Sequence, residues 1–257
     1  MKYQYSYQTD KGNVRVSNQD SLLVTGVRSK HGQALLAAVC DGVGGLSGGE
    51  QTSRLTAELL QKWAEYELPQ ILDQEECKKL MEYRFGQLIQ EINKEVYYTN
   101  QQKGIVSGTT LSAMIVWDNH YVTGHVGDSR IYRIRNEVTQ ITTDHSLVAF
   151  ELAAGRITPE EAKKDSRQNV ITQSIGTSLK ITPEIQSGTF SETQVFVLCT
   201  DGFWHLIETG EWLACFSPDT ACEAEQLKQQ IALLVQRVRE KGERDNITAI
   251  AIYVALE

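Results

Sequence analysis

Hydrophobic and polar residues follow two periods along this chain, one typical of strands and one typical of helices. Residues 3–9 alternate as a half-buried strand does, so we predict a β-strand near the start. Residues 21–27 and 33–40 are largely apolar runs separated by the polar pentapeptide RSKHG. This pattern predicts a β-hairpin, and with it the first part of a sheet.

Two helices are predicted after the hairpin. The first begins near residue 48, because Ser47 and Glu50 have the spacing of a capping box. The second is predicted over about residues 74–100. Its apolar positions recur at steps of three and four residues, which gives the helix one buried face. These positions are Leu80, Met81, Phe85, Leu88, Ile89, Ile92 and Val96.

Strand-like sequence then returns in three runs with short breaks, GTTLSAMIVW, HYVTGHVG and RIYRI. Their short connections predict an antiparallel meander. Further along, residues 195–199 are typical of a buried strand, and residues 203–216 of two short helices. A long helix is predicted over residues 221–241 with Gly242 as its stop, and the segment ITAIAIYVAL closes the chain as a strand.

Residues 144–172 differ from the segments on either side of them. They are polar, show little strand pattern and contain TPEEAKK. Thr158, Pro159 and Glu161 have the positions expected at the start of a short capped helix. We therefore predict that residues 144–172 form an excursion outside the main core.

The order of elements favours an α+β fold with a sheet core and helices packed outside it. Strands and helices do not alternate strictly, which disfavours a doubly wound parallel sheet. A length of 257 residues suits one large domain or two small ones. With 41% hydrophobic and 23% charged residues, the composition is that of an ordinary globular protein with a substantial core.

Charge and cysteine content narrow the functional classes. The formal net charge of −8 argues against nucleic-acid binding through a basic face. The five cysteines include no C-x-x-C pair, which favours a reduced chain. The segment MKYQYSYQTD lacks the apolar core of a signal peptide, and no run is long enough for a membrane span. We expect a cytoplasmic protein without membrane contact.

Acidic residues recur where predicted strands meet loops. The segments QALLAAVCDG and TQVFVLCTDG end alike, with Asp41 and Asp201 after an apolar run. Asp128 follows a third strand, Asp245 precedes the last strand, and Asp20 precedes the second. If these strand ends coincide in space, five carboxylates converge.

Convergence of acids requires compensation. Two unit charges about 5 Å apart repel by roughly 3 kcal/mol at an effective dielectric constant of about 20. Protonation or divalent cations would relieve this repulsion. Oxygen ligands without clustered histidine or cysteine favour Mg²⁺ or Mn²⁺. Asp-Gly is also a common turn dipeptide, so the residue pattern alone leaves a simple turn open at each site.

The glycine-rich segment after Asp41 raises the alternative of a dinucleotide loop. Gly42 and Gly44 fit the fingerprint, but Ser47 stands where the third glycine belongs. Arg15 precedes Asp20 by five residues and could bind a phosphate through two oxygens, or be a solvated loop residue. A metal-dependent phosphodiesterase or nuclease is disfavoured by the acidic composition.

Eight short motifs occur in order along nearly the whole chain: RVSNQD, DGVGG, SGTT, GHVGDSR, ITPEEA, VITQSIG, CTDGFW and RDN. Together they resemble the metal-dependent protein phosphatase 2C family in its compact bacterial form. The resemblance implies a four-layer α-β-β-α sandwich of two antiparallel sheets flanked by helices. It also implies one catalytic domain over residues 1–257, with a flap at about residues 145–170.

The resemblance assigns metal-binding roles to the acids. Asp41 resembles the carboxylate that bridges two core ions of Mn²⁺ or Mg²⁺, and the Gly42 carbonyl resembles a ligand of one of them. Asp201 and Asp245 resemble ligands of the other ion. Asp20 resembles an acid that reaches a metal through water. In bacterial members, Asp128 and Asp201 match the positions that share a third ion.

The resemblance also implies a function. Members hydrolyse phosphoserine and phosphothreonine in proteins by direct attack of a water that two metal ions activate, and Arg15 matches their phosphate-binding arginine. Asp41, Asp201 and Arg15 are thus the expected catalytic residues. Val43 stands where animal members usually carry histidine, and Gln19 replaces a common glutamate. These two departures keep open a catalytically silent phosphoprotein-binding regulator.

The expected partners are phosphorylated proteins, including a serine/threonine kinase and its substrates. We expect a monomer that binds neither nucleic acid nor membrane.

Overall fold

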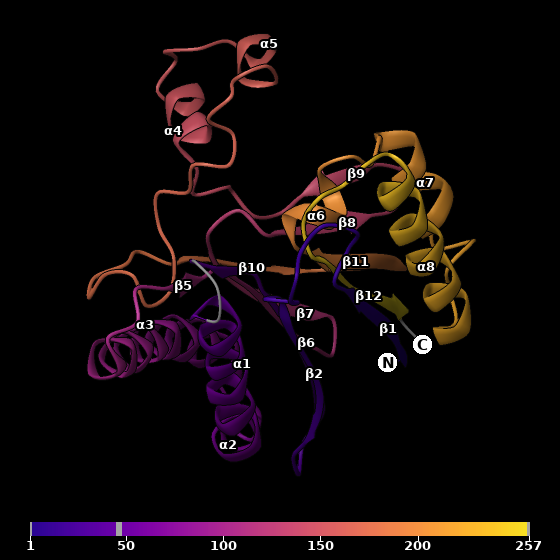
Figure 1. Ribbon diagram of the computed structural model, residues 1–257. Helices are drawn as coiled ribbons and strands as arrows, with labels where there is room; N and C mark the ends of the chain where they lie inside the picture. The colour runs from indigo at the N-terminus through magenta and orange to yellow at the C-terminus, as the bar shows by residue number, and fades with distance from the viewer. Residues whose placement is uncertain (1, 45–47, 256–257) are drawn as a thin grey trace.

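The computed structural model describes residues 2–44 and 48–255. Its centre consists of two five-stranded sheets in which all pairings are antiparallel (Figure 1). In spatial order, the first sheet contains β1 (Lys2–Asp10), β12 (Ile247–Ala255), β11 (Gln194–Cys199), β8 (Arg130–Ile134) and β9 (Val138–Gln140). The second contains β10 (Glu184–Thr189), β7 (His120–Val126), β6 (Leu111–Trp117), β3 (Gln33–Cys40) and β2 (Ser21–Arg28).

Helices cover the outer face of each sheet (Figure 1). The second sheet packs against α1 (Gly48–Tyr66), α2 (Leu68–Leu72) and α3 (Cys77–Lys103). The first sheet packs against α6 (Asp201–Trp204), α7 (Thr209–Phe216) and α8 (Ala224–Glu240). The α+β class and the order of four layers, helix, sheet, sheet and helix, are therefore confirmed.

Strand β3 shows why the layers form. Leu35, Ala37 and Val39 point into the core between the two sheets. Leu36 and Ala38 alternate with them and pack against the helices outside. Successive side chains of a strand point to opposite faces, so a strand buried on both faces must be apolar throughout. The run ALLAAVC meets that requirement.

The predicted meander is wrong in its third strand. Strands β6 and β7 form the expected hairpin, but β8 leaves that sheet and pairs with β11 and β9 in the other. The three residues between β7 and β8 include Gly127, whose φ of +113° lets the chain turn sharply from one sheet to the other. Short connections therefore did not imply pairing here.

Three strands were not predicted: β9, β10 and the two-residue β4 (Gly42–Val43). Strand β10 lies at a sheet edge, and its sequence EIQSGT alternates too weakly to reveal it. The predicted second helix corresponds to α3, and α2 before it was not predicted. Helix α3 ends at Lys103 because Gly104 takes a left-handed conformation with φ of +65°. Ser47 of the predicted capping box lies outside the described residues.

The excursion of residues 144–172 carries α4 (Leu147–Ala153) and α5 (Pro159–Ala162), which lie beyond one end of the sandwich (Figure 1). The capping box is present at α5, where the Thr158 hydroxyl accepts a hydrogen bond from the Glu161 amide and the Glu161 carboxylate accepts one from the Thr158 amide. Over the described ranges, no helix is both long and apolar enough to cross a membrane.

Candidate active site

Strand pairing in the second sheet brings Asp20 beside Asp41. In an antiparallel pair, the start of one strand lies beside the end of its neighbour. Ser21, the first residue of β2, is paired with Cys40, the last residue of β3. Asp20 and Asp41 are the next residues outward, so both lie at the same rim of the sheet.

The same logic places three more acids at the rim of the first sheet. Cys199 at the end of β11 is paired with Ala249 near the start of β12, so Asp201 and Asp245 leave from neighbouring strands. Cys199 is also paired with Arg130, the first residue of β8, which places Asp128 on the other side of Asp201. The predicted convergence of strand ends is therefore present within each sheet.

Electrostatics shows that the acids of the two sheets also approach each other. The pKa of Asp41 lies well above its ordinary value, first because its carboxyl is buried and then because of four neighbouring negative charges. These charges belong to Asp20, Asp201, Asp128 and Asp245. All five predicted acids thus share one electrostatic environment.

Two buried carboxylate oxygens at this rim have no hydrogen-bond partner. They are Oδ1 of Asp20 and Oδ1 of Asp201. The second oxygen of Asp20 accepts a hydrogen bond of 3.0 Å from the Thr200 hydroxyl. Burial raises the pKa of both acids, and nearby carboxylates raise it further. Buried polar atoms are nearly always paired, so these oxygens point to a missing positive partner.

The chemistry of these donors fits a hard divalent cation, which prefers oxygen ligands. Among residues 2–44 and 48–255, however, no three His, Cys, Asp or Glu side chains already form a group that could hold a metal ion. The donors are therefore assembled at one rim but do not form a closed cage.

Arg15 contacts one of the predicted ligands. Its Nε donates to Oδ1 of Asp245 at 2.8 Å, and its Nη2 donates to Oδ2 at 2.5 Å. The Arg15 side chain is 51% exposed and that of Asp245 28% exposed, so the pair lies at the mouth of the site. The structure thus brings the predicted phosphate-binding arginine to the acids, where it occupies both oxygens of Asp245.

The loop before β2 is held in place by Asn246, to which the sequence interpretation gave no role of its own. The Asn246 side chain accepts a hydrogen bond from the Gln19 amide at 2.8 Å and donates to the carbonyls of Lys11 and Ser17. Gln19 in turn accepts a hydrogen bond of 3.2 Å from the amide of Gly42. The buried Asn246 therefore connects the strand ends of both sheets.

Gly42 has a structural reason to be glycine. A Cβ atom at this position would lie 2.5 Å from the backbone of Gly49 in the first turn of α1 and 2.6 Å from the Gln19 carbonyl oxygen. Gly42 begins the two-residue strand β4 (Gly42–Val43), which pairs with β5 (Gly108–Thr109). Close backbone packing accounts for this glycine without any role in phosphate binding. The dinucleotide-binding loop, which the incomplete fingerprint already disfavoured, is not needed to explain it.

The comparisons with known proteins agree with this geometry. Residues 12–247 match the protein phosphatase 2C family. The chain belongs to the protein phosphatase 2C family. It is 30% identical to the protein phosphatase PhpP of Streptococcus pneumoniae over 96% of both chains. It is 29% identical to a serine/threonine phosphatase of Listeria innocua over 96% of this chain and 94% of the relative.

Solved structures of the same family superpose closely. The serine/threonine phosphatase Stp1 of Staphylococcus aureus matches with a TM-score of 0.85 at 26% identity, over 100% of this chain and 96% of Stp1. The catalytic domain of the phosphatase PstP, solved with two manganese ions, matches with a TM-score of 0.78 at 25% identity over 98% of both chains. This protein phosphatase 2C member is thus a serine/threonine protein phosphatase.

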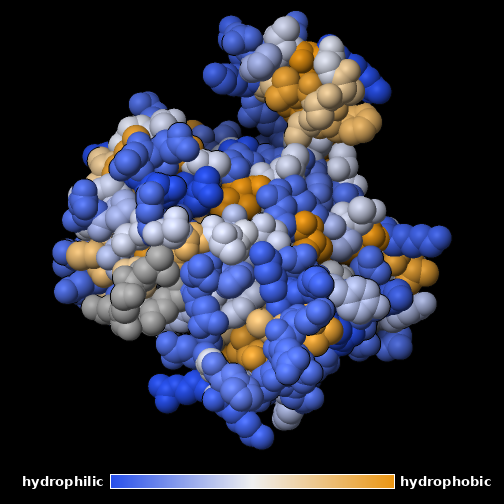
Figure 2. Space-filling view, turned by 180° about the vertical axis from the view of Figure 1, so that it is seen from behind, coloured by the Kyte–Doolittle hydropathy of each residue, from blue (hydrophilic) through white to orange (hydrophobic). Residues whose placement is uncertain are grey.

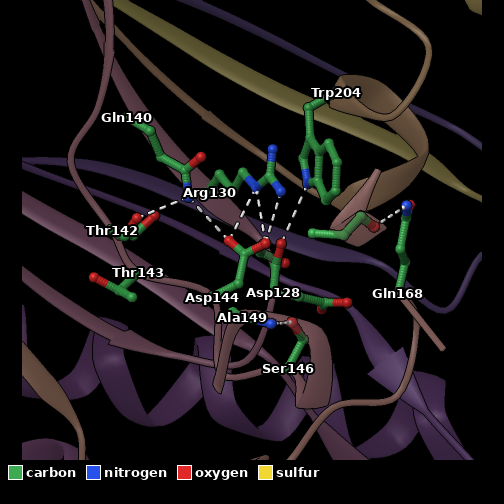
Figure 3. A network of polar contacts seen from close by, with 12 residues as sticks. Asp128, Arg130, Gln140, Thr142, Thr143, Asp144, Ser146, Ala149, Gln168 and Trp204 are labelled. Carbon is green, nitrogen blue, oxygen red and sulfur yellow. Dashed lines mark hydrogen bonds and ion pairs between the residues drawn. The ribbon is translucent and has the colours of Figure 1, made fainter. Parts of the chain in front are cut away.

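In this phosphatase, Asp128 is supported by a cluster at the base of the excursion (Figure 3). The Trp204 indole donates a hydrogen bond of 3.2 Å to the Asp128 carbonyl. The Arg130 guanidinium stacks 3.3 Å from the centre of the Trp204 ring and makes a two-point ion pair with Asp144. Sequence reasoning found Asp128 but not Trp204, although the motif CTDGFW contains it.

A buried histidine, His125, lies on β7 next to the last residue of that strand. The Ser112 hydroxyl lies 2.9 Å from His125 Nδ1. Its Nε2, however, is buried without a partner, so the ring is only half satisfied. Burial and the neighbouring His145 lower the pKa of His125, which keeps the ring neutral near pH 7.

Proposed function

We propose that this phosphatase dephosphorylates phosphoserine and phosphothreonine in proteins with two Mn²⁺ or Mg²⁺ ions held at the strand-end acids. The proposed ligands are Asp41, the Gly42 carbonyl, Asp201, Asp245 and Asp20, with a third ion at Asp128 and Asp201. The observation that carries the proposal is the pair of buried, unpartnered oxygens of Asp20 and Asp201. The relative solved with two manganese ions supports it.

Each residue has a separable task in the proposal. Asp41 has charged neighbours among the acids of both sheets, so it would be the ligand shared by the two ions. When bound, the ions would supply a nucleophile from water and positive charge for the phosphate oxygens. Arg15 pairs with both oxygens of Asp245 in the structure, and the same two-point donor geometry would suit a phosphate once Asp245 binds an ion. It would hold the phosphate of the substrate for in-line attack.

Val43 cannot transfer a proton, so the leaving oxygen must take its proton from another source. Val43 lies on β4 directly after Gly42 and is partly exposed beside the acids. The expected direct attack by water needs no phosphorylated enzyme side chain. The same site in a chain that binds but does not turn over phosphoprotein is the second candidate function, and Val43 is the residue that favours it.

The broader assignments follow the family. We propose that residues 1–257 act as one catalytic domain, that the excursion acts as a flap, and that the phosphatase acts as a monomer on phosphorylated proteins. A serine/threonine kinase and its targets are the substrates we would test first.

A small ester tests the site without a protein substrate. We expect phosphate release from p-nitrophenyl phosphate that requires Mn²⁺ and is lost in Asp201→Asn. Asp219→Asn, an exposed acid on the same half of the chain, is the matched control. Binding of Mn²⁺ without release of phosphate by the unaltered protein would establish the silent alternative. Full activity of Asp201→Asn would refute the assigned site.

A further inference from the structure

A cavity of about 500 Å³ lies between the excursion and α6. Its walls include Val148 and Leu152 of α4, Pro159 and Ala162 of α5, Lys163, and Trp204 of α6. Figure 2 shows apolar surface gathered on the lobe that α4 and α5 form. The volume lies within the range of ordinary ligand pockets.

The cavity shares a wall with the candidate active site. Trp204 lines it and donates its indole hydrogen bond to the Asp128 carbonyl, so one side chain separates the cavity from that acid's backbone. Trp204 also follows Asp201 by three residues on α6. A polypeptide that places a phosphorylated residue at the acids would therefore pass this opening.

The polar groups at the base of the cavity are already paired. Arg130 and Asp144 form a two-point ion pair, which Gln140 extends by a hydrogen bond of 3.0 Å to Asp144. His205 lies 3.7 Å from the Glu243 carboxylate. Few anchors remain for a small polar ligand, which would need several placed polar groups.

Lys163 is the exception among these charges. Its ammonium has no ion pair or hydrogen bond with any residue in the described part of the chain. The neighbouring Lys164 is also exposed but does not line the cavity. The walls thus combine an apolar surface with one available positive charge.

We propose that this cavity binds the polypeptide beside the phosphorylated residue of the substrate, with an apolar side chain against Leu152 and an acidic side chain at Lys163. The proposal rests on the proposed function, because it uses the same active site. It makes Leu152 and Lys163 specificity-determining residues. The occupant is a phosphoprotein segment rich in apolar and acidic residues.

The test is a charge reversal with a neighbouring control. Phosphothreonine peptides that differ only in an acidic or a basic residue beside an apolar one would be compared by kcat/KM, normalised to p-nitrophenyl phosphate. In Lys163→Glu, we expect the ratio of acidic to basic peptide to fall by about fivefold or more, since an exposed ion pair is replaced by repulsion. Lys164→Glu should leave the ratio near that of the unaltered protein.

The apolar half of the proposal has its own pair of variants. In Leu152→Ala, we expect the preference for peptides with the apolar residue, measured by kcat/KM, to fall by about tenfold. The loss of one apolar contact in a pocket changes specificity by about this factor. Leu233→Ala on α8 is the control, since Leu152 and Leu233 are 38% and 45% exposed respectively.

The outcomes separate the two levels of inference. The peptide-binding cavity would be overturned if Lys163→Glu and Lys164→Glu changed the ratio of acidic to basic peptide equally. It would also be overturned if Lys163→Glu left that ratio unchanged and Leu152→Ala left the preference for the apolar residue unchanged. Either result would leave the active site in place. No release of phosphate from any substrate by the unaltered protein with Mn²⁺ would instead refute the proposed function.

Discussion

Removal of one carboxylate from the acid cluster should stabilise the metal-free protein while abolishing its activity. Burial, together with the neighbouring Asp245, raises the pKa of Asp201 from 3.8 to about 6. This difference corresponds to about 3 kcal/mol that disfavours the folded state when Asp201 is ionised. Asp201→Asn removes the charge and keeps the shape.

The gain in the free energy of unfolding should be smaller than this electrostatic penalty. Oδ1 of Asp201 is buried without a partner, so the amide of Asp201→Asn would also keep an unsatisfied atom, at a cost of about 1–3 kcal/mol. We therefore expect the free energy of unfolding to rise by up to about 2 kcal/mol in the absence of metal. Urea denaturation in EDTA, followed by tryptophan fluorescence, measures it.

The stability difference between Asp201→Asn and the unaltered protein should depend on pH, and the direction follows from the raised pKa of Asp201. A carboxyl whose pKa is raised on folding destabilises the folded state above its unfolded pKa. For Asp201, this penalty is absent below 3.8, grows as the pH rises and is complete above about 6. The electrostatic advantage of Asp201→Asn should therefore be complete above pH 6 and vanish below pH 4, where only the cost of the unsatisfied amide remains. Asp219→Asn, at an exposed position, should change the free energy of unfolding by less than about 0.5 kcal/mol. A variant less stable than the unaltered protein at pH 8 in EDTA would show that the acids do not repel one another.

Three further results are expected. Arg15→Ala should raise KM for a phosphopeptide by about tenfold, which is the loss expected for a charged hydrogen bond, while the Mn²⁺ affinity measured by calorimetry stays undiminished. An unchanged KM would remove Arg15 from the phosphate site. Trp204→Phe loses the hydrogen bond to the Asp128 carbonyl and should raise the Mn²⁺ concentration needed for half-maximal activity several-fold, whereas equal dependence would separate Asp128 from the ions. Thr158→Ala removes the helix cap of α5, worth about 1 kcal/mol locally, and should change peptide preference more than hydrolysis of p-nitrophenyl phosphate; equal effects on both would make the excursion mere scaffold.

The sequence predicted those parts of the fold that depend on local pattern. Buried strands such as β3 and β11 and the amphipathic helix α8 were found, because their apolar periodicity follows directly from burial. The sheet to which β8 belongs was not found. That choice depends on the turn at Gly127 and on which neighbour completes each sheet, and neither leaves a periodic signal.

The candidate site was predictable to a different degree. The acids could be found because they repeat at the ends of apolar runs, and antiparallel register then brings them together. The contact of Arg15 with Asp245 and the support of Asp128 by Trp204 join residues far apart in the chain. Such contacts are properties of the assembled fold, so no spacing in the sequence announces them.

The acid cluster draws its members from both halves of the sandwich, and only the packed layer between the halves fixes their separation. Met114 from one half and Phe196 from the other belong to that fully buried layer. Interiors are close-packed and transmit strain, so we expect a change of even one methylene there to alter how the two halves pack. If a core variant of this enzyme lost turnover, that loss alone would therefore not show that the altered side chain takes part in catalysis. Misaligned carboxylates, detected as weakened manganese affinity with unchanged secondary structure, would be the expected signature.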